Sequence, residues 1–332
     1  MVKFLVIRIS SIGDIVLTTP VIRGLHQQVE GARVHFLTKK EYAGLLSANP
    51  YLDKVHVLDN NLPELVQQLK AESFDYIIDL QNNLRSSRIK SGLKRMYFTV
   101  NKLNLKKWLF VNFRINRLPS LHIVDRYLET VRVFDVQNDG NGLDHFIPAN
   151  EEYAIRSLPE TFHEGYIVLA IGAGHATKKM PSEKLVDVCN QLNHPTIIIG
   201  GSEDRVPADT VIEHSTKSDL LNLCGSLTVH GSASLIRQAN CVITHDTGMM
   251  HIAAAFRKKI ITVWGNTVPD FGMSPYMPDP ASVSFGIDNL SCRPCSKLGY
   301  RRCPKSHFKC MNDHDTKAIA EQANALFILT GQ

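Results

Sequence analysis

One turn in the second half of the chain combines residue types that suit anion binding. It consists of His245, Asp246, Thr247 and Gly248. Residues 241–244 are typical of a buried parallel strand, and the Ala-rich residues after the turn favour a helix. A helix that starts at the carboxyl edge of a sheet presents free N–H groups and a positive dipole end to phosphate. His251, four residues past Thr247, can reach the same anion. Taken alone, the motif is equally consistent with an ordinary helix capped by Asp246 or Thr247.

A second candidate is the turn after the first apolar run. It reads Ser10-Ser11-Ile12-Gly13-Asp14. Gly13 permits a tight strand-to-helix turn, and Asp14 then opens the helix at the carboxyl edge of the sheet. A carboxylate there can act as a general base, or it can serve only as a helix cap. The turn lacks the full Gly-x-Gly-x-x-Gly pattern, which disfavours a dinucleotide site.

Two glycine-containing loops follow strands in the second half. Loop 172–181 carries Lys178, whose charge suits a phosphate, although the P-loop spacing is absent. A flexible loop with exposed lysines explains this pattern as well. Loop 200–204 ends in Glu203 and Asp204, and acidic groups in such a place often bind sugar hydroxyls.

The positive charge of the chain is concentrated in one segment, the basic tract of residues 80–124. The net charge is only +5, yet this tract has no Asp or Glu. Its basic residues are Arg85, Arg88, Lys90, Lys94, Arg95, Lys102, Lys106, Lys107, Arg114 and Arg117. Interleaved Trp108, Phe110 and Phe113 favour a membrane surface with anionic lipid over a nucleic-acid groove, and no nucleic-acid-binding module is present. A solvated basic face is the simpler alternative.

Four of the seven cysteines are clustered near the C-terminus. They are Cys292, Cys295, Cys303 and Cys310, with His307 and His314 nearby. In a reducing compartment such a cluster is compatible with tetrahedral zinc, but the spacing is not that of two Cys-x-x-Cys pairs. We therefore favour reduced structural thiols, with disulfides as another alternative. We expect no metal at the catalytic site, because no Asp-x-Asp motif stands out that would hold a cation there.

The composition is that of an ordinary globular protein. No apolar run approaches the roughly 20 residues of a membrane span. The first apolar run, 4–9, is too short for a signal peptide, is interrupted by Arg8 and is followed by Asp14. We therefore expect a cytoplasmic protein, peripheral at the inner face of the cytoplasmic membrane.

Strand-like apolar runs alternate with helical patterns in both halves. The expected strands are 4–9, 34–37, 55–58, 76–80, 96–100, 166–171, 196–199, 242–244 and 260–264. The expected helices are 15–28, 43–47, 62–72, 124–136, 183–192, 232–239, 249–256 and 316–329. This α/β pattern predicts two Rossmann-like domains with parallel sheets that face a central cleft. We place them at residues 1–150 and 151–315, joined through a polar stretch at 137–163.

Together these stretches resemble glycosyltransferase family 9, the ADP-heptose:lipopolysaccharide heptosyltransferases. The matching segments are 7–20, 79–86, 177–181, 246–255 and the cysteine segment that ends at 307–311. The specific element is the pairing of Asp-Thr-Gly-x-x-His-x-Ala at 246–253 with the N-terminal Gly13-Asp14. The sequence departs from the family at Met180, where an aromatic residue is common, and at Asn82, where glycine is more usual.

The resemblance implies a GT-B fold in which the final helix, within 316–332, packs back on the N-terminal domain. It also implies inverting, metal-independent transfer of heptose from ADP-heptose to the lipopolysaccharide inner core, with no required cofactor. Asp14 matches the family's general base and Lys178 a lysine on the donor phosphate. The other donor-binding matches are Thr247, Gly248 and His251 for the diphosphate, Asp246 near the sugar, and Glu203 or Asp204 for the ribose.

The basic tract suits an anionic glycolipid acceptor, and we assign Asn82, Arg85 and Arg88 to acceptor binding. Three alternatives remain open. The chain can be a related transferase that uses another nucleotide sugar, a GT-B-like nucleotide-sugar epimerase, or a lipid-binding protein on a transferase scaffold.

Overall fold

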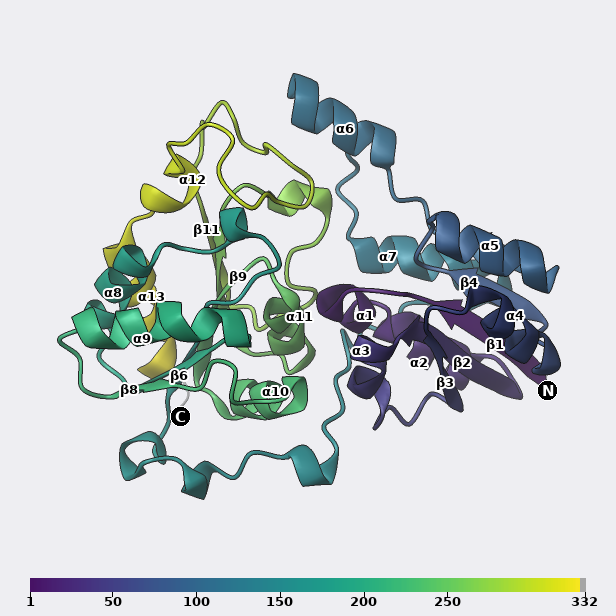
Figure 1. The fold of residues 1–332 in the computed structure, drawn as a ribbon, viewed down its shortest axis with the longest axis horizontal. Coiled ribbons are helices and arrows are strands. Elements are labelled where there is room, and N and C mark those ends of the chain that lie inside the picture. Colours follow the sequence, from purple (N-terminus) through teal and green to yellow (C-terminus); the bar gives the residue numbers. More distant parts are fainter. Residues whose placement is uncertain (329–332) are drawn as a thin grey trace. The chain divides into compact units, whose positions relative to one another are not determined.

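A computed structural model describes residues 1–328, which divide into two compact units (Figure 1). Unit 1 comprises Met1–Asn104 and Ser120–Pro148, and unit 2 comprises Leu105–Pro119 and the chain from Ala149 onward. Each unit contains one wholly parallel sheet with helices, which confirms the α/β class. The predicted division at residue 150 placed Leu105–Pro119 in the first domain, whereas in the structure this segment groups with unit 2.

The sheet of unit 1 has the order β3-β2-β1-β4-β5. Its strands are β1 (Val2–Ile7), β2 (Ala32–Lys39), β3 (Lys54–Leu58), β4 (Tyr76–Asp79) and β5 (Met96–Thr99). Its helices are α1 (Ile12–Val16), α2 (Thr19–Gln28), α3 (Lys40–Ala43), α4 (Leu62–Ala71), α5 (Leu84–Leu93) and α7 (Ile123–Leu128). One core lies between the sheet and α4 and α5, where Leu5, Ile7, Leu69 and Ile89 are fully buried.

Two predicted helices of unit 1 are shorter than expected. The pattern over 15–28 is divided between α1 and α2, because Pro20 has no N–H and favours the first turn of a new helix. The helix expected at 124–136 continues beyond α7 only as a 3-10 helix, Glu129–Phe134.

The sheet of unit 2 has the order β11-β10-β9-β6-β7-β8. Its strands are β6 (Ile167–Ala170), β7 (Thr196–Ile199), β8 (Leu220–Asn222), β9 (Cys241–His245), β10 (Lys259–Trp264) and β11 (Val283–Gly286). The central strands β6, β7 and β9 are buried along their whole length, which explains their unbroken apolar runs. The short strands β8 and β11 were not predicted, since they lie at the edges and are only partly buried.

Helices cover both faces of this second sheet (Figure 1). They are α8 (Ser182–Gln191), α9 (Arg205–His214), α10 (Val229–Gln238), α11 (Gly248–Ala255), α12 (Lys309–Asn312) and α13 (Thr316–Ile328). Helix α13 packs on α8, β9 and β10, through buried Ile319, Ala323 and Leu326. These contacts lie within unit 2. The predicted packing of the final helix on the first domain stays a prediction, and residues 329–332 lie outside the described residues.

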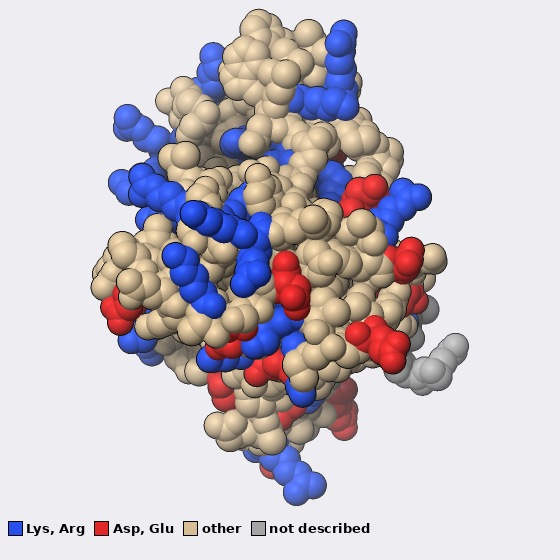
Figure 2. Space-filling model, turned by 90° about the vertical axis from the view of Figure 1, so that its right-hand side faces the viewer, with Lys and Arg blue, Asp and Glu red and all other residues tan. Residues whose placement is uncertain are grey.

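Helix α6 (Asn104–Phe113) is ten residues long, yet none of its residues is buried. Figure 2 shows one face of the molecule, on which Lys and Arg are more frequent in the upper part and Asp and Glu in the lower part.

Within residues 1–328, no helix is both long enough and apolar enough to cross a membrane.

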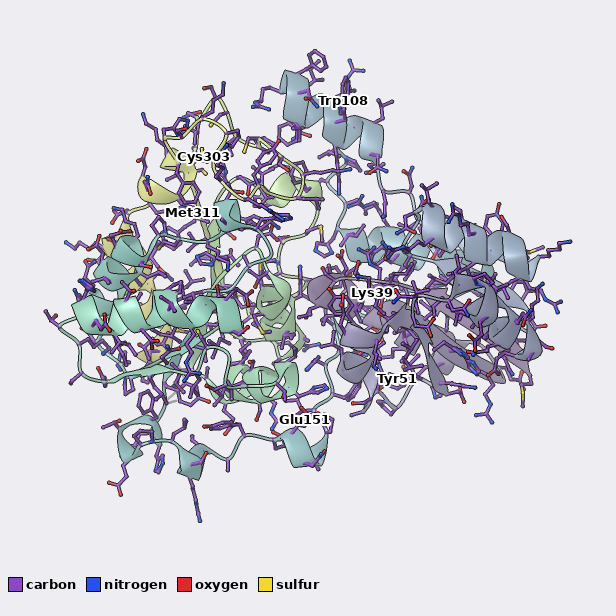
Figure 3. The ribbon with its side chains drawn as sticks, viewed as in Figure 1. Lys39, Tyr51, Trp108, Glu151, Cys303 and Met311 are labelled. Atoms are coloured by element: carbon purple, nitrogen blue, oxygen red, sulfur yellow. The ribbon has the colours of Figure 1, made fainter. Side chains whose placement is uncertain are left out.

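The segment between β11 and α13 has little regular structure, and it carries the clustered cysteines; Figure 3 labels Cys303 and Met311 there. Met311 is fully buried in the core of unit 2. Arg293 fixes the start of the segment by donating to the backbone oxygens of Gly265, Thr267 and Ile287. The segment is therefore anchored to the end of β10.

Candidate active site

In each sheet the strand order reverses at one point, and the candidate residues follow the strands on either side of it. In unit 1 the reversal lies between β1 and β4, which are followed by Asp14 and Asn82. In unit 2 it lies between β6 and β9, which are followed by Lys178 and Asp246. Open α/β sheets bind ligands outside the carboxyl ends of strands at such switch points. The topology therefore brings the predicted residues of each unit to its favoured ligand-binding edge.

Asp14 lies in the first turn of α1 and is held from two directions. Ser11 donates to Asp14 Oδ2 from its backbone N–H at 3.3 Å and from its hydroxyl at 3.0 Å. Arg8 Nη2 lies 2.6 Å from Oδ1. The Asp14 side chain keeps 22% of its surface exposed. The carboxylate is thus oriented by its neighbours and still accessible to a substrate.

Arg8 controls the ionisation of Asp14. Burial raises the pKa of Asp14, but the charge of Arg8 and the hydrogen bonds from Ser11 and Arg8 outweigh burial, so the pKa lies below its ordinary value. Arg8 is itself fixed by donating to the backbone oxygens of Ser10 and Leu80 and to the Tyr127 hydroxyl, at 2.8, 2.7 and 3.0 Å. Asp14 is therefore ionised at neutral pH.

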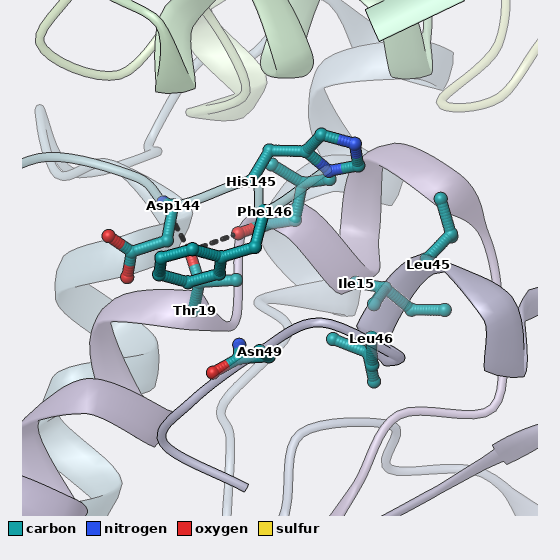
Figure 4. A pocket seen from close by; sticks show the side chains of 9 residues that line it. Ile15, Thr19, Leu45, Leu46, Asn49, Asp144, His145 and Phe146 are labelled. Atoms are coloured by element: carbon teal, nitrogen blue, oxygen red, sulfur yellow. Dashed lines mark hydrogen bonds between the residues drawn. The ribbon is translucent and has the colours of Figure 1, made fainter. Parts of the chain in front are cut away.

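A small pocket opens beside α1 (Figure 4). Its lining residues are Ile15, Val16, Thr19, Leu45, Leu46, Asn49, Asp144, His145 and Phe146. Thr19 Oγ1 donates to the Val16 backbone oxygen at 2.8 Å and accepts the Asp144 N–H at 2.8 Å. Asp144 also pairs with Arg23, which is buried. Asp144 is thus fastened to α2, the helix that follows α1.

Asn82 follows β4 in a left-handed conformation with φ of +44°, which favours glycine and which Asn adopts more readily than most other residues. Its side chain donates to the Val100 backbone oxygen at 2.9 Å, and its N–H donates to Asp79 Oδ1 at 2.8 Å. Asp79 is fully buried and pairs with Lys90 at 2.7 Å. Arg85 and Arg88 lie exposed on α5. The two arginines are accessible to an anion, whereas the Asn82 amide is already used to hold its loop.

In unit 2, Lys178 and Asp246 form an ion pair at the start of α11. Lys178 Nζ lies 2.6 Å from Asp246 Oδ2, and both side chains are mostly buried. The Thr267 hydroxyl donates to the same carboxylate oxygen at 2.8 Å. Thr247 caps α11, since its hydroxyl accepts the Met249 N–H at 3.2 Å, and Gly248 is the first helical residue. The Lys178 ammonium therefore lies beside the free N–H groups at the start of α11, which is the arrangement that an anion-binding site requires.

The loop that carries Lys178 is fixed from two sides. Thr177 donates to Asn266 Oδ1 at 3.1 Å and accepts the Tyr300 N–H at 2.8 Å. The Met180 N–H donates to His245 Nε2 at 3.1 Å. Burial lowers the pKa of His245 to about 4, so the ring stays neutral and keeps its acceptor. The loop position of Lys178 thus depends on a buried, neutral histidine.

The two acidic candidates for the ribose differ sharply in their surroundings. Asp204 is buried, pairs with Lys179 and accepts the Gly201 N–H at 2.9 Å. A Cβ at Gly172 or Gly200 would lie 2.7 Å from the Asp204 side chain, so both glycines are needed for this packing. Glu203 is exposed. Asp204 is therefore occupied within the fold, and Glu203 is the carboxylate that a ligand can reach.

His251 is 98% buried, on the first turns of α11. Its predicted contact with the donor phosphate stays a prediction. Near the C-terminus, Cys292 Sγ lies 3.7 Å from His307 Nε2. Within residues 1–328, no three ligand atoms of the cysteine cluster lie within 4.8 Å of one another, and so the geometry gives no support to zinc there.

The positioning roles of three residues, Arg8, His245 and Thr267, were not predicted, although His245 was part of the predicted anion-binding turn. Arg8 and His245 each lie at the carboxyl end of a strand, and Thr267 follows β10. A charged or imidazole side chain that ends an otherwise apolar strand is the signal that marks the first two.

Comparisons with known proteins bear on the family and the fold of the chain. A family model described as glycosyltransferase family 9 (heptosyltransferase) matches residues 63–301. Lipopolysaccharide heptosyltransferase 1 of Campylobacter coli is 23% identical, over 80% of this chain and 84% of that protein. Lipooligosaccharide heptosyltransferase 2 of Campylobacter jejuni is 22% identical, over 95% of each chain.

The solved structure of the Escherichia coli ADP-heptose lipopolysaccharide heptosyltransferase II has a TM-score of 0.77 and 16% identity, covering 99% of this chain and all of that one. The likeness confirms the predicted GT-B fold. Because the family model spans most of the sequence, the chain belongs to glycosyltransferase family 9.

Proposed function

We propose that the chain transfers heptose from ADP-heptose to the inner core of lipopolysaccharide, with inversion at the anomeric carbon. The observation that carries this proposal is the Lys178–Asp246 pair beside the capped start of α11. This arrangement suits a diphosphate that is joined to a polar sugar. The names of the relatives supply the identity of that sugar.

In the proposed reaction, Lys178, Thr247 and Gly248 hold the diphosphate, with His251 below them in α11. Asp246 lies next to the sugar, and Glu203 binds the ribose. As the bond between the anomeric carbon and phosphate breaks, negative charge grows on the departing ADP. Lys178 offsets this charge, and the interaction strengthens as the charge grows, so it accelerates the reaction.

Asp14 is the proposed general base. An acceptor hydroxyl attacks the anomeric carbon from the face opposite ADP and gives its proton to the Asp14 carboxylate. The lowered pKa keeps Asp14 ionised, and Ser11 and Arg8 hold it in one orientation. No step of this scheme requires a metal or another cofactor.

The acceptor proposal rests on charge. Arg85 and Arg88 are exposed on α5, within the acid-free basic tract. They suit the phosphates and carboxylates of an anionic glycolipid. Asn82 serves the same site indirectly, because its hydrogen bond to Val100 holds the loop before these arginines.

Helix α6 is the proposed contact with the anionic inner leaflet. Leu105, Trp108 and Phe113 are 71%, 52% and 58% exposed, which is unusual for large apolar side chains. Figure 3 labels Trp108 on this helix. Lys106 is exposed among them. An apolar surface with interspersed cations fits anionic lipid by both hydrophobic burial and charge. The expected localisation is therefore peripheral, at the cytoplasmic face of the membrane.

A donor panel tests the proposed function. The protein is incubated with ADP-heptose, other ADP-sugars and UDP-sugars, with and without lipopolysaccharide that lacks its heptoses. We expect nucleotide release only from ADP-heptose and only with acceptor present. Release without acceptor would identify an epimerase or hydrolase, and preference for another donor would contradict the heptose assignment.

A further inference from the structure

We propose that His35, His56 and Glu72 form a binding site for a divalent transition metal of the Zn²⁺ class, at the edge of unit 1 opposite the proposed transfer site. Within residues 1–328, they are the group of three His, Cys, Asp or Glu whose ligand atoms all lie within 4.8 Å of one another. The inference does not depend on the proposed function.

The ligand distances fit a small tetrahedral ion. His35 Nδ1 and His56 Nε2 share a hydrogen bond of 3.0 Å, which a metal would replace. His35 Nδ1 lies 3.9 Å from Glu72 Oε2, and His56 Nε2 lies 4.0 Å from Glu72 Oε1. Zn²⁺ binds such atoms at about 2.0–2.2 Å, and a tetrahedron of that size has edges of about 3.3–3.6 Å. The three observed separations bracket this range. Small side-chain movements would therefore complete three ligand positions and leave a fourth for water.

The fold prepares the two imidazoles for this role. His35 on β2 and His56 on β3 point to the same face of the sheet, since the register pairs His35 with Lys54 and Leu37 with His56. Both side chains are more than 90% buried. The ring of Phe74 contacts both imidazoles edge-on, at 5.2 and 5.9 Å between centroids. The rings are thus held in place without a metal.

The protonation states also suit a cation. Burial, with a smaller effect of His35, lowers the pKa of His56 to about 4, and burial lowers the pKa of His35. A hydrogen bond from Lys54 is the main reason that the pKa of Glu72 falls to about 2. Imidazole nitrogen and carboxylate oxygen are donor types that Zn²⁺ takes, and the proposal is carried by the proximity of these atoms and the burial of both rings.

Two lysines compete with a metal for Glu72. Lys54 Nζ lies 2.5 Å from Oε1, and Lys3 Nζ lies 3.3 Å from Oε2. The Lys54 side chain is 55% exposed, so it can turn to solvent when a metal takes its place. This competition makes a distinctive prediction, because removal of Lys54 should strengthen metal binding, whereas a merely damaging substitution would weaken it.

The site lies where a metal would join separate elements. Glu72 ends α4, while His35 and His56 belong to adjacent strands, and β3 is an edge strand. Asp14 follows the opposite, carboxyl end of β1. Metal binding is therefore expected to raise the thermal stability of the chain and to leave the transfer rate unchanged.

The test is a titration of chelator-treated full-length protein with Zn²⁺ by calorimetry and with Co²⁺ by visible absorption, at neutral pH. The variants are His56→Gln, Glu72→Gln and Lys54→Met, and His214→Gln, which alters an exposed histidine of α9, is the control. We expect one site per chain in the wild type and control. Binding should be at least tenfold weaker in His56→Gln and Glu72→Gln and tighter in Lys54→Met.

Equal binding by wild type and His56→Gln would overturn the proposal, because any bound metal would then lie elsewhere, as at the cysteine thiolates. Unchanged or weaker binding in Lys54→Met would overturn it too, and this outcome is interpretable even if His56→Gln fails to fold. A wild type that binds neither ion would be equally decisive. The donor panel does not involve this site, so either proposal can fail alone.

Discussion

The guanidinium of Arg8 lies 2.6 Å from the carboxylate of Asp14, and Arg8 is almost fully buried. This ion pair sets the base strength of Asp14. It keeps the carboxylate ionised over the whole neutral range, at the cost of making it a weaker proton acceptor than an unpaired carboxylate.

The first prediction concerns the acid limb of the pH profile. Arg8→Gln removes the charge that lowers the pKa of Asp14, so burial should raise that pKa. The acid limb of kcat/KM should then move to higher pH, because Asp14 becomes protonated earlier as the pH falls. Arg8→Lys keeps the charge and should retain a wild-type profile. Identical acid limbs in the Gln and Lys variants would exclude this electrostatic role.

The second prediction separates catalysis from donor binding. Asp14→Asn removes the proton acceptor at almost constant volume, and should lower kcat about 10²- to 10⁴-fold. ADP affinity, measured by calorimetry, should stay within twofold, since the proposed donor contacts lie in unit 2. Retained turnover would remove Asp14 from the base role.

The third prediction tests the donor cation. Lys178→Ala should weaken ADP binding roughly 10- to 100-fold, because a hydrogen bond to a charged group contributes about 1.5–3 kcal/mol. Lys184→Ala, which alters a lysine in the next helix, α8, is the matched control and should bind ADP normally. Equal affinities in the two variants would argue against a phosphate contact by Lys178.

The fourth prediction follows from the buried imidazole of His245. Its folded pKa of about 4 lies below the unfolded value of about 6.5, so its stabilising contribution is present above pH 6.5 and is lost as the pH falls toward 4. The difference corresponds to on the order of 3 kcal/mol. Thermal melts of wild type, His245→Gln and His214→Gln across this window, with chelator present, measure the effect. The wild type and His214→Gln should lose stability in parallel, and His245→Gln should lose less.

The fifth prediction concerns α6 and lipid. Lys106→Glu with Lys107→Glu should reduce binding to vesicles that contain anionic lipid, and Arg156→Glu with Lys184→Glu, an equal charge change elsewhere in unit 2, should not. Trp264 is buried and Trp108 is exposed, so a blue shift of fluorescence on binding reports α6 directly. Trp108 fluorescence that does not change when vesicles are added would count against the proposed contact.

Much of the fold was predictable because its central strands are continuous runs of buried apolar residues. The sequence of β7, Thr-Ile-Ile-Ile, has the character of a central parallel strand and is one. Edge elements such as β8 and β11 lack that signal. Helix α6 was missed for a related reason, since none of its residues is packed in the core.

The candidate site was predictable where a motif fixes local geometry, as at Thr247, which caps α11. Long-range partners were not. Nothing local pairs Lys178 with Asp246, or Met180 with His245, because residues 68 and 65 positions apart meet only through the sheet. The sequence could not show which of Glu203 and Asp204 is available to the ribose. The structure shows that Asp204 is packed against Gly172 and Gly200.

The Lys178–Asp246 pair has a consequence for selectivity among anions. Because the ammonium is already neutralised by a carboxylate, the pair presents little net positive charge to inorganic phosphate. In the proposed mode of binding, phosphate would take the place of the carboxylate at Lys178, and sugar hydroxyls would bind Asp246. The proposed roles therefore predict that the intact nucleotide sugar binds more tightly than its fragments.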